Sequence, residues 1–368
     1  MNKKVTYLYF DDLEGAANAV KDNLESDLLT VTIKRELPWN DMITYLLDNQ
    51  SLFDGLILDW KLDGEDDSNA NFSSEALAQQ CRRLQVDKIN GRGFSKSFPI
   101  ILCSAQPGFK TIHERDTTSE DLFDGVFEKS DLEDQEEFLI SLINAYDILS
   151  DTDKSIDDII GLSKEKQKVI DNTLIRKINE IRNRQPHEMV QFLLKEVLNK
   201  KGALINVENL AAKLGVNINS KGWEELKNEM DHFKYKGILL NGERWWADLI
   251  NEFWVNNFEG TTLKFLTAKE RISFLETKYN NLKDRLDEPN LSLGAESKEF
   301  WTVCYVSNMP IAEMDGFIID QHIHYPWQDR EYVCLDVAMN ETSRGELWYS
   351  LLPYEEERLK SYFENTEK

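Results

Sequence analysis

Three carboxylates, a hydroxyl group and a lysine occur in the first 130 residues, each at the end of a short apolar segment. Asp11 and Asp12 follow one such segment, Asp59 ends another, and Ser104 and Lys129 end two more. Carboxylates that meet repel one another unless a cation lies among them, and an oxygen-rich pocket suits hydrated Mg²⁺. A lysine and a hydroxyl beside the metal can hold phosphoryl oxygens. The set therefore predicts phosphoryl transfer to a carboxylate, although each residue taken singly fits a turn, a cap or a solvated side chain.

The elements that must position these residues alternate between strands and helices. Strand patterns rich in β-branched and aromatic residues occur at residues 5–10, 28–37, 56–59, 98–104 and 125–128. Helical spacing of apolar residues occurs between them at residues 15–25, 39–48 and 74–84. A further helix should follow residue 129, because Ser130 and Glu133 match a capping box. This alternation predicts a parallel, doubly wound sheet, with all five residues at the edge where such sheets bind ligands.

Residues 4–150 resemble the receiver domain of two-component response regulators. The resemblance is carried by the pair Asp11-Asp12, the segment LILDWKLDG with Asp59, the segment PIILCSA with Ser104, and Lys129. It implies an α/β flavodoxin-like fold with a five-stranded parallel sheet. It also implies that a histidine kinase donates a phosphoryl group to Asp59, with at most an autophosphatase activity in the chain itself.

The resemblance assigns a role to each residue at the strand ends. Asp11, Asp12, Asp59 and the backbone carbonyl of Lys61 would hold Mg²⁺. Ser104 would bond a phosphoryl oxygen as the switch hydroxyl, and Lys129 would pair with the phosphate charge.

Three features depart from the family pattern. Val126 stands where the family has its switch aromatic, Ser130 stands where a proline usually follows the lysine, and the segment from Asp59 to Ser104 is long. These departures put the usual aromatic-coupled switching in doubt. A phosphate acceptor that does not switch is therefore a second reading of the same site.

Composition limits the classes of partner. The chain has 368 residues, with 67 acidic against 43 basic residues and a formal net charge of -24, which disfavours binding to nucleic acid or to anionic membranes. Its four cysteines include no CxxC pair, which suits a reducing compartment. No apolar stretch approaches the roughly 18 residues of a membrane span. We therefore expect a soluble cytoplasmic protein that does not bind a membrane.

The length predicts more than one domain. We expect a receiver-like domain at residues 1–150, a polar linker at 151–163, a helical region at 164–290 and a strand-rich region at 291–368. Together the last two would form an α+β module that is helical first and strand-rich at the end. A mixed-charge helix at 165–184 could connect, dimerise or simply pack, so a homodimer is left open.

Residues 207–215 and 220–235 have helix-turn-helix-like spacing. The second segment holds four bases among residues 221–236 against four acids, whereas a recognition helix should be net basic. A small helical packing unit is the preferred interpretation, so DNA binding is disfavoured and a protein partner is expected for this module. Trp245, Trp246 and Trp254 predict an aromatic helix face that belongs to the core. Thr267 and Glu270 predict a capped helix with heptad spacing as far as Leu286.

Strand patterns return at residues 301–306, 316–319, 332–337 and 346–351. His322 and His324 alternate on one segment, and Cys304 and Cys334 lie on two others, but their spacing matches no zinc pattern. No enzyme motif is evident in residues 165–368, so an enzymatic activity stays uncertain and is not expected.

The preferred reading is a phosphoacceptor signalling protein with a non-DNA-binding output module. One alternative is a phosphate sink in a two-component-like, conceivably antiphage, pathway. A second is a transcriptional regulator, and a third is a hydrolase or transferase hidden in residues 165–368.

Overall fold

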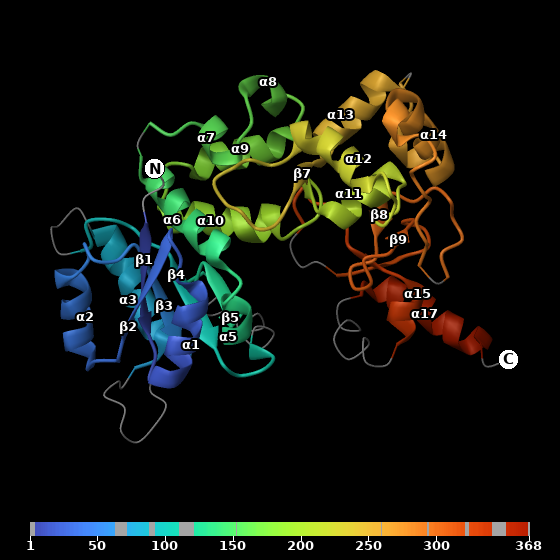
Figure 1. Cartoon of the computed structure of the whole chain (residues 1–368). Helices are drawn as coiled ribbons and strands as arrows, with labels where there is room; N and C mark the ends of the chain where they lie inside the picture. Colours follow the sequence, from blue (N-terminus) through green and yellow to red (C-terminus); the bar gives the residue numbers. More distant parts are fainter. Residues whose placement is uncertain are drawn as a thin grey trace. The chain divides into compact units, whose positions relative to one another are not determined.

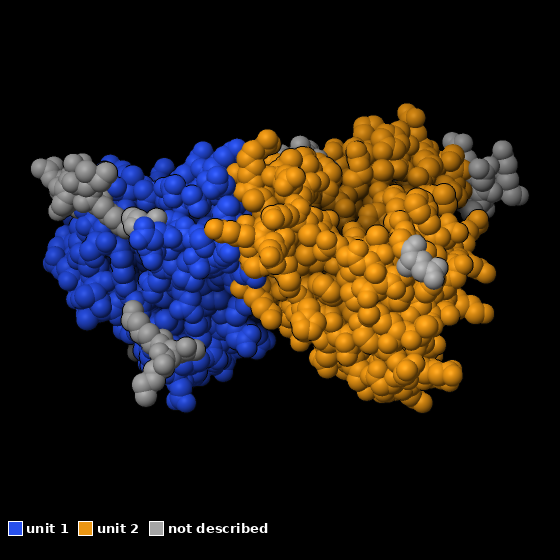
Figure 2. Space-filling model, turned by 90° about the horizontal axis from the view of Figure 1, so that it is seen from above, with its two compact units in different colours: residues 1–161, 178–194, 237–240 blue, residues 162–177, 195–236, 241–368 orange. Residues whose placement is uncertain are grey.

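The computed structural model describes residues 4–62, 72–87, 93–109, 121–151, 153–258, 260–292, 294–320, 324–340 and 351–366. Within these ranges the chain divides into two compact units, each described below by itself (Figure 2). Unit 1 comprises residues 1–161, 178–194 and 237–240, and unit 2 comprises residues 162–177, 195–236 and 241–368.

Unit 1 is built on a parallel five-stranded sheet in the order β2-β1-β3-β4-β5. Its strands are β1 (Val5–Phe10), β2 (Leu29–Lys34), β3 (Gly55–Asp59), β4 (Ile100–Ser104) and β5 (Gly125–Glu128). Every residue of β3 and β4 is buried, as expected for central strands covered on both faces. This strand order is the flavodoxin-like one, and it confirms the predicted fold class.

Helices cover both faces of this sheet (Figure 1). They are α1 (Glu14–Leu24), α2 (Trp39–Asp48), α3 (Ser74–Val86), α5 (Lys129–Leu132) and α6 (Glu136–Ser150). Met42 and Leu46 of α2 share one apolar cluster with Leu77 of α3 and Leu58 of β3. On the other face, the Tyr7 hydroxyl donates a hydrogen bond of 2.9 Å to a backbone carbonyl of α6.

The predicted capping box at Ser130 is wrong. Ser130 lies inside α5, which begins at Lys129, and α6 begins only at Glu136 with no side-chain cap. The chain turns into α5 directly after β5, where the Lys129 side chain bonds two carboxylates across the sheet edge. That tertiary contact decides where the helix starts.

Two further helices belong to unit 1. Helix α7 (Ile156–Ile160) begins at a capping box formed by Ser155 and Asp158, and its two last residues are buried. Helix α10 (Pro186–Leu193) begins with proline in its first turn and packs against α6. The domain boundaries expected from the sequence, including a linker at 151–163, stay a prediction.

The remaining helical part is mostly in unit 2. Its elements are α8 (Lys164–Gln167), α9 (Asn172–Ile181), η2 (Leu194–Leu198), α11 (Val207–Leu214), α12 (Trp223–Glu229), η3 (Met230–Phe233), α13 (Ala247–Asn257), η4 (Leu263–Phe265), α14 (Ala268–Lys278) and η5 (Asn280–Leu282). The single helix predicted at 165–184 is wrong, because the chain breaks between α8 and α9. Asp171 there accepts hydrogen bonds from the backbone amides of Thr173 and Leu174 and so starts a new helix.

Short antiparallel strand pairs complete unit 2. They are β6 (Leu204–Ile205) with β7 (Trp245–Trp246), β8 (Thr302–Val303) with β9 (Pro310–Ile311), and β10 (Phe317–Ile318) with β11 (Tyr332–Val333). Helices α15 (Leu335–Met339) and α17 (Pro353–Thr366) lie at the end of the chain. The strand predicted at 332–337 therefore ends early, and that at 346–351 falls outside the described residues except Leu351, which forms a bridge with Ile319.

The aromatic prediction for this unit is partly confirmed. Trp245, Trp246 and Trp254 are all fully buried in the core, but the first two lie on β7 rather than on a helix. The capping box of Thr267 and Glu270 is present, whereas α14 ends at Lys278, so the heptad does not continue to Leu286 as a helix.

Candidate functional site

The five predicted residues all lie at the carboxyl edge of the unit 1 sheet. Asp11 directly follows β1, Asp59 ends β3 and Ser104 ends β4. Strand register pairs Phe10 with Leu58 and Asp59 with Cys103, which brings the ends of these strands level. Lys129 follows β5 at the same edge. The parallel sheet thus gathers residues that are far apart in the sequence.

A lysine joins two of the carboxylates. The Lys129 Nζ atom lies 2.7 Å from Asp11 Oδ2 and 2.8 Å from Asp59 Oδ1. The exposed fractions of these side chains are 10% for Lys129, 0% for Asp11 and 9% for Asp59. Because the three charges are largely out of water, their attraction is screened far less than that of a surface ion pair.

Asp11 is held by further hydrogen bonds. The Tyr9 hydroxyl donates to Asp11 Oδ2 at 2.5 Å, and the Leu13 amide donates to Oδ1 at 2.8 Å. The sequence did not predict a role for Tyr9. A signal was present, because residues two apart in an extended segment, such as Tyr9 and Asp11, point to the same face of the sheet. Burial and the neighbouring Cys103 and Asp11 raise the pKa of Tyr9, so it stays a neutral donor.

Asp59 is positioned by its own loop. The Lys61 amide donates to Asp59 Oδ2 at 3.0 Å, and the Ser74 hydroxyl donates to the Asp59 backbone carbonyl. These contacts leave the carboxylate fixed at the end of a buried strand, with Oδ1 on the lysine and Oδ2 on the amide.

Oxygens of Asp11, Asp12 and Asp59 lie within 4.8 Å of one another. Such a set of carboxylate oxygens fits a hard divalent cation like Mg²⁺, which takes one or two carboxylates and keeps several waters. Among the described residues, no other group of three or more histidine, cysteine or acidic side chains converges in this way.

Cys304 and Cys334 are neighbours in unit 2, where the Cys334 amide donates to Cys304 Sγ at 3.3 Å. His322 lies outside the described residues.

Burial and the neighbouring charges shift the pKa values of three side chains in this cluster. Burial raises the pKa of Asp59, and Lys129 opposes this shift. Burial and then the charges of Asp59 and Asp11 raise the pKa of Asp12. Burial disfavours the Lys129 ammonium, but its bonds to Asp11 and Asp59 outweigh this and raise its pKa, so it stays charged. One lysine therefore does not fully compensate three acids.

Ser104 is buried at the end of β4, and its hydroxyl oxygen accepts a hydrogen bond of 3.1 Å from the Gln106 amide. Val126 packs against the apolar cluster on one face of the sheet. The following residue, Phe127, points to the other face, where its ring centroid lies 5.8 Å from that of Phe138 in α6. The structure therefore brings all the predicted residues to one edge. Their chemical roles, including that of the Lys61 carbonyl, stay predictions.

No family model and no curated protein matches the chain. Among solved structures, a CheY-like response regulator receiver domain from Methylobacillus flagellatus is 17% identical and covers 34% of this chain and 87% of its own, with a TM-score of 0.25. A receiver domain protein from Clostridium thermocellum is 14% identical over 37% and 94% of the two chains, with a TM-score of 0.25. The response regulator RcsB from Salmonella typhimurium is 16% identical over 54% and 92%, with a TM-score of 0.26.

These solved structures are proteins to which part of the chain is similar, and the similarity says nothing about activity. In the chain itself, the strand order of unit 1 is that of a flavodoxin-like fold, with the carboxylates of Asp11, Asp12 and Asp59 close together. Among the described residues no helix is long and apolar enough to cross a membrane.

Proposed function

We propose that this chain is a cytoplasmic phosphoacceptor of the response-regulator type, phosphorylated on Asp59 by a histidine kinase with Mg²⁺ as cofactor. The observation that supports it best is the buried cluster in which Lys129 bonds Asp59 and Asp11 beside Asp12. This edge gathers three carboxylates around one lysine, so the negative charge exceeds what the single ammonium group supplies.

Each residue has a distinct part in the proposed reaction. An oxygen of Asp59 attacks the phosphorus atom of the donor, and the leaving group takes the electron pair of the broken bond. Lys129, already at Asp59 Oδ1, stays beside the phosphoryl group and compensates its charge. Ser104 donates its hydroxyl to a phosphoryl oxygen. Asp11, Asp12, Asp59 and the Lys61 carbonyl would hold Mg²⁺, which when bound neutralises charge on the phosphoryl oxygens.

Phosphorylation by acetyl phosphate and Mg²⁺, followed by intact-mass analysis, tests the acceptor. We expect one phosphoryl adduct in the native chain and none in Asp59→Asn. Asp54→Asn is the matched control, because Asp54 directly precedes the same strand and accepts hydrogen bonds from Thr6 and Lys96. An adduct that persists in Asp59→Asn, or its loss in Asp54→Asn alone, would move the acceptor elsewhere.

A phosphate sink is the second candidate, and Val126 favours it. Val126 offers no ring that could reorient when Ser104 moves, and it already packs in the core cluster. A sink predicts equal amide hydrogen exchange around β5 before and after phosphorylation. A phosphorylation-dependent change there would instead support a switching regulator.

We also propose that unit 2 is an interaction module that does not bind DNA. Helix α12 is short, buries Trp223 and Leu226, and carries three acids against one lysine. Such a helix lacks the basic exposed face that a recognition helix presents to phosphates. Sequence-selective binding of the full chain to duplex DNA would contradict this part of the proposal.

A further inference from the structure

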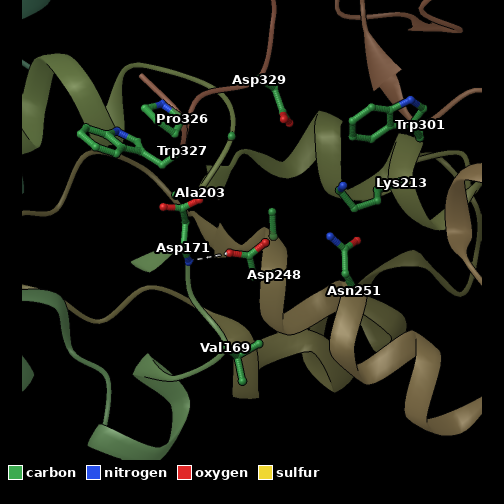
Figure 3. Close-up of a pocket in the computed structure, with 12 residues that line it drawn as sticks. Val169, Asp171, Ala203, Lys213, Asp248, Asn251, Trp301, Pro326, Trp327 and Asp329 are labelled. Atoms are coloured by element: carbon green, nitrogen blue, oxygen red, sulfur yellow. Dashed lines mark hydrogen bonds between the residues drawn. The ribbon is translucent and has the colours of Figure 1, made fainter. Parts of the chain in front are cut away.

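Unit 2 contains a cavity of about 420 Å³ that the proposed phosphoacceptor function does not use. Its wall combines one lysine, Lys213, with three aspartates, Asp171, Asp248 and Asp329, and with the rings of Trp301 and Trp327. Figure 3 shows polar ends of Lys213, Asp248, Asp329 and Asn251 directed toward the same space. The volume falls in the range of small-molecule sites.

Lys213 is the most unusual group in this wall. The residue is only 4% exposed, and its ammonium group makes no hydrogen bond or ion pair with the described residues. Its ammonium group lies over the Trp301 ring, 4.6 Å from the ring centroid. Burial lowers its pKa, and the nearby charges of Asp329 and Asp248 only partly oppose this. Lys213 lines the cavity with its polar end directed into it, so an anionic group of a ligand can reach the ammonium group (Figure 3).

A second lysine on the same ring provides a contrast. Lys264 Nζ lies 4.8 Å from the Trp301 ring, but it also pairs with Glu313 at 3.1 Å and its side chain is 48% exposed. Lys264 is therefore an ordinary surface lysine, and it is not part of the cavity wall.

The three aspartates differ in how many hydrogen bonds their carboxylates already accept from the chain. Asp171 caps α9, and Asp248 Oδ2 accepts the Asp171 amide at 3.1 Å. The Asp329 carboxylate makes no hydrogen bond or ion pair in the described part of the chain, and burial raises its pKa. The cavity therefore presents a cationic end at Lys213 and an anionic end at Asp329 with the remaining oxygen of Asp248.

This pattern selects one class of ligand. A metal ion is disfavoured, because the aspartate oxygens here do not converge as those of Asp11, Asp12 and Asp59 do among the described residues. A simple anion would meet Asp329, and a simple cation would meet Lys213. A molecule with both charges satisfies both ends, and aromatic rings suit the carbon chain between them.

We propose that this cavity binds a small zwitterion of the amino-acid class, with Lys213 contacting its carboxylate and Asp329 and Asp248 contacting its ammonium group. Two of these groups are held on helices, Lys213 in the last turn of α11 and Asp248 in the first turn of α13. Trp327 is fixed as well, because its Nε1 donates to the Glu196 carbonyl at 3.0 Å and its ring stacks on Tyr325. Such preformed walls reduce the cost of ordering on binding.

Calorimetric titration of the full-length chain tests the proposal with a series of amino acids of increasing length: glycine, β-alanine, 4-aminobutyrate and 6-aminohexanoate. We expect saturable binding of at least one member with one site per chain. Butylamine and butyrate, which carry one charge each, should bind at least about tenfold more weakly, as expected when one charge-assisted contact is lost.

Variants locate the site. Lys213→Met and Asp329→Asn should each lower the affinity for the tightest-binding amino acid by about tenfold or more. Lys264→Met should weaken binding far less than Lys213→Met does, and Asp59→Asn should leave affinity unchanged, which separates this proposal from the phosphoacceptor one. If Lys213→Met does not fold, as judged by circular dichroism, Asp329→Asn decides. Equal affinity for the singly charged compounds, no binding of any zwitterion, or an equal loss in Lys264→Met would overturn the proposal.

Discussion

Lys129 in unit 1 and Lys213 in unit 2 are both buried lysines beside aspartates, with exposed fractions of 8% and 4%. Lys129 lies within 2.8 Å of two carboxylate oxygens, and its pKa is raised. Lys213 contacts no carboxylate, and its pKa is lowered. The same residue type, equally removed from water, is thus stabilised as a cation in one region and destabilised in the other.

The difference shows that burial and nearby acids do not by themselves make an ion pair. At the sheet edge, strand register fixes Asp11 and Asp59 at bonding distance from Lys129. In the unit 2 cavity, Lys213 and the three aspartates line the same wall, but no ion pair joins Lys213 to any of them (Figure 3). We infer that the first lysine contributes to the folded state itself, whereas the second costs stability until a ligand is bound. Three predictions test this contrast.

The largest expected effect is that of Lys129→Met on stability. Removing the cation leaves Asp11 and Asp59 buried and unpaired, so we expect a loss of about 3 kcal/mol in the free energy of unfolding. Urea denaturation at neutral pH measures it, and added Mg²⁺ should recover part of the loss. Lys96→Met is the control, because the more exposed Lys96–Asp54 pair at 2.7 Å should contribute less than about 1 kcal/mol. A loss no larger than the control's would remove the distinction between the two lysines.

Lys213→Met should change the free energy of unfolding much less than Lys129→Met does. The change should be close to zero or a small gain in stability. Methionine fills a similar volume and removes an unpaired buried charge, so we expect the free energy of unfolding to stay the same or rise by up to about 1 kcal/mol. The same urea experiment without added amino acids measures this change. A destabilisation as large as that of Lys129→Met would mean that Lys213 has a partner within the chain.

The smallest effect concerns pH. Because the pKa of Lys213 in the folded chain lies below its usual value of 10.5, the unfolded chain holds this proton to a higher pH than the folded chain. Native stability relative to Lys213→Met should therefore rise as the pH increases toward 10.5, by at most about 1.4 kcal/mol per pH unit. Asp329 and Asp248 weaken this trend by favouring the ammonium form, and Arg271 and Lys264 strengthen it. A flat difference between the two proteins above pH 8 would contradict the lowered pKa of Lys213.

Much of unit 1 is determined by local sequence. Each strand is a short segment rich in apolar residues that ends in a polar residue or directly precedes one, so both the alternation with helices and the positions of Asp59, Ser104 and Lys129 follow from patterns within about ten residues. The parallel topology then requires the carboxyl ends to share an edge. The parallel sheet and the shared edge of the candidate site residues were therefore predictable from the sequence, whereas the order of the strands in the sheet was not.

Tertiary structure decided what depends on partners distant in the sequence. Trp245 and Trp246 have an apolar character that suits a helix or a strand, and only pairing with Leu204 and Ile205 makes them a strand. The start of α5 depends on where the Lys129 ammonium meets two other strands, which no capping pattern records.

The cavity of unit 2 is the clearest case. Asp171, Lys213, Asp248 and Asp329 are spread over more than 150 residues, and no local spacing relates them. The sequence by itself determined the acidic sheet edge, because a parallel sheet aligns its strand ends whatever their separation in the chain. Only packing decided the cavity, because irregular loops and short helices have no such rule, and the distances between their side chains are set by the whole core.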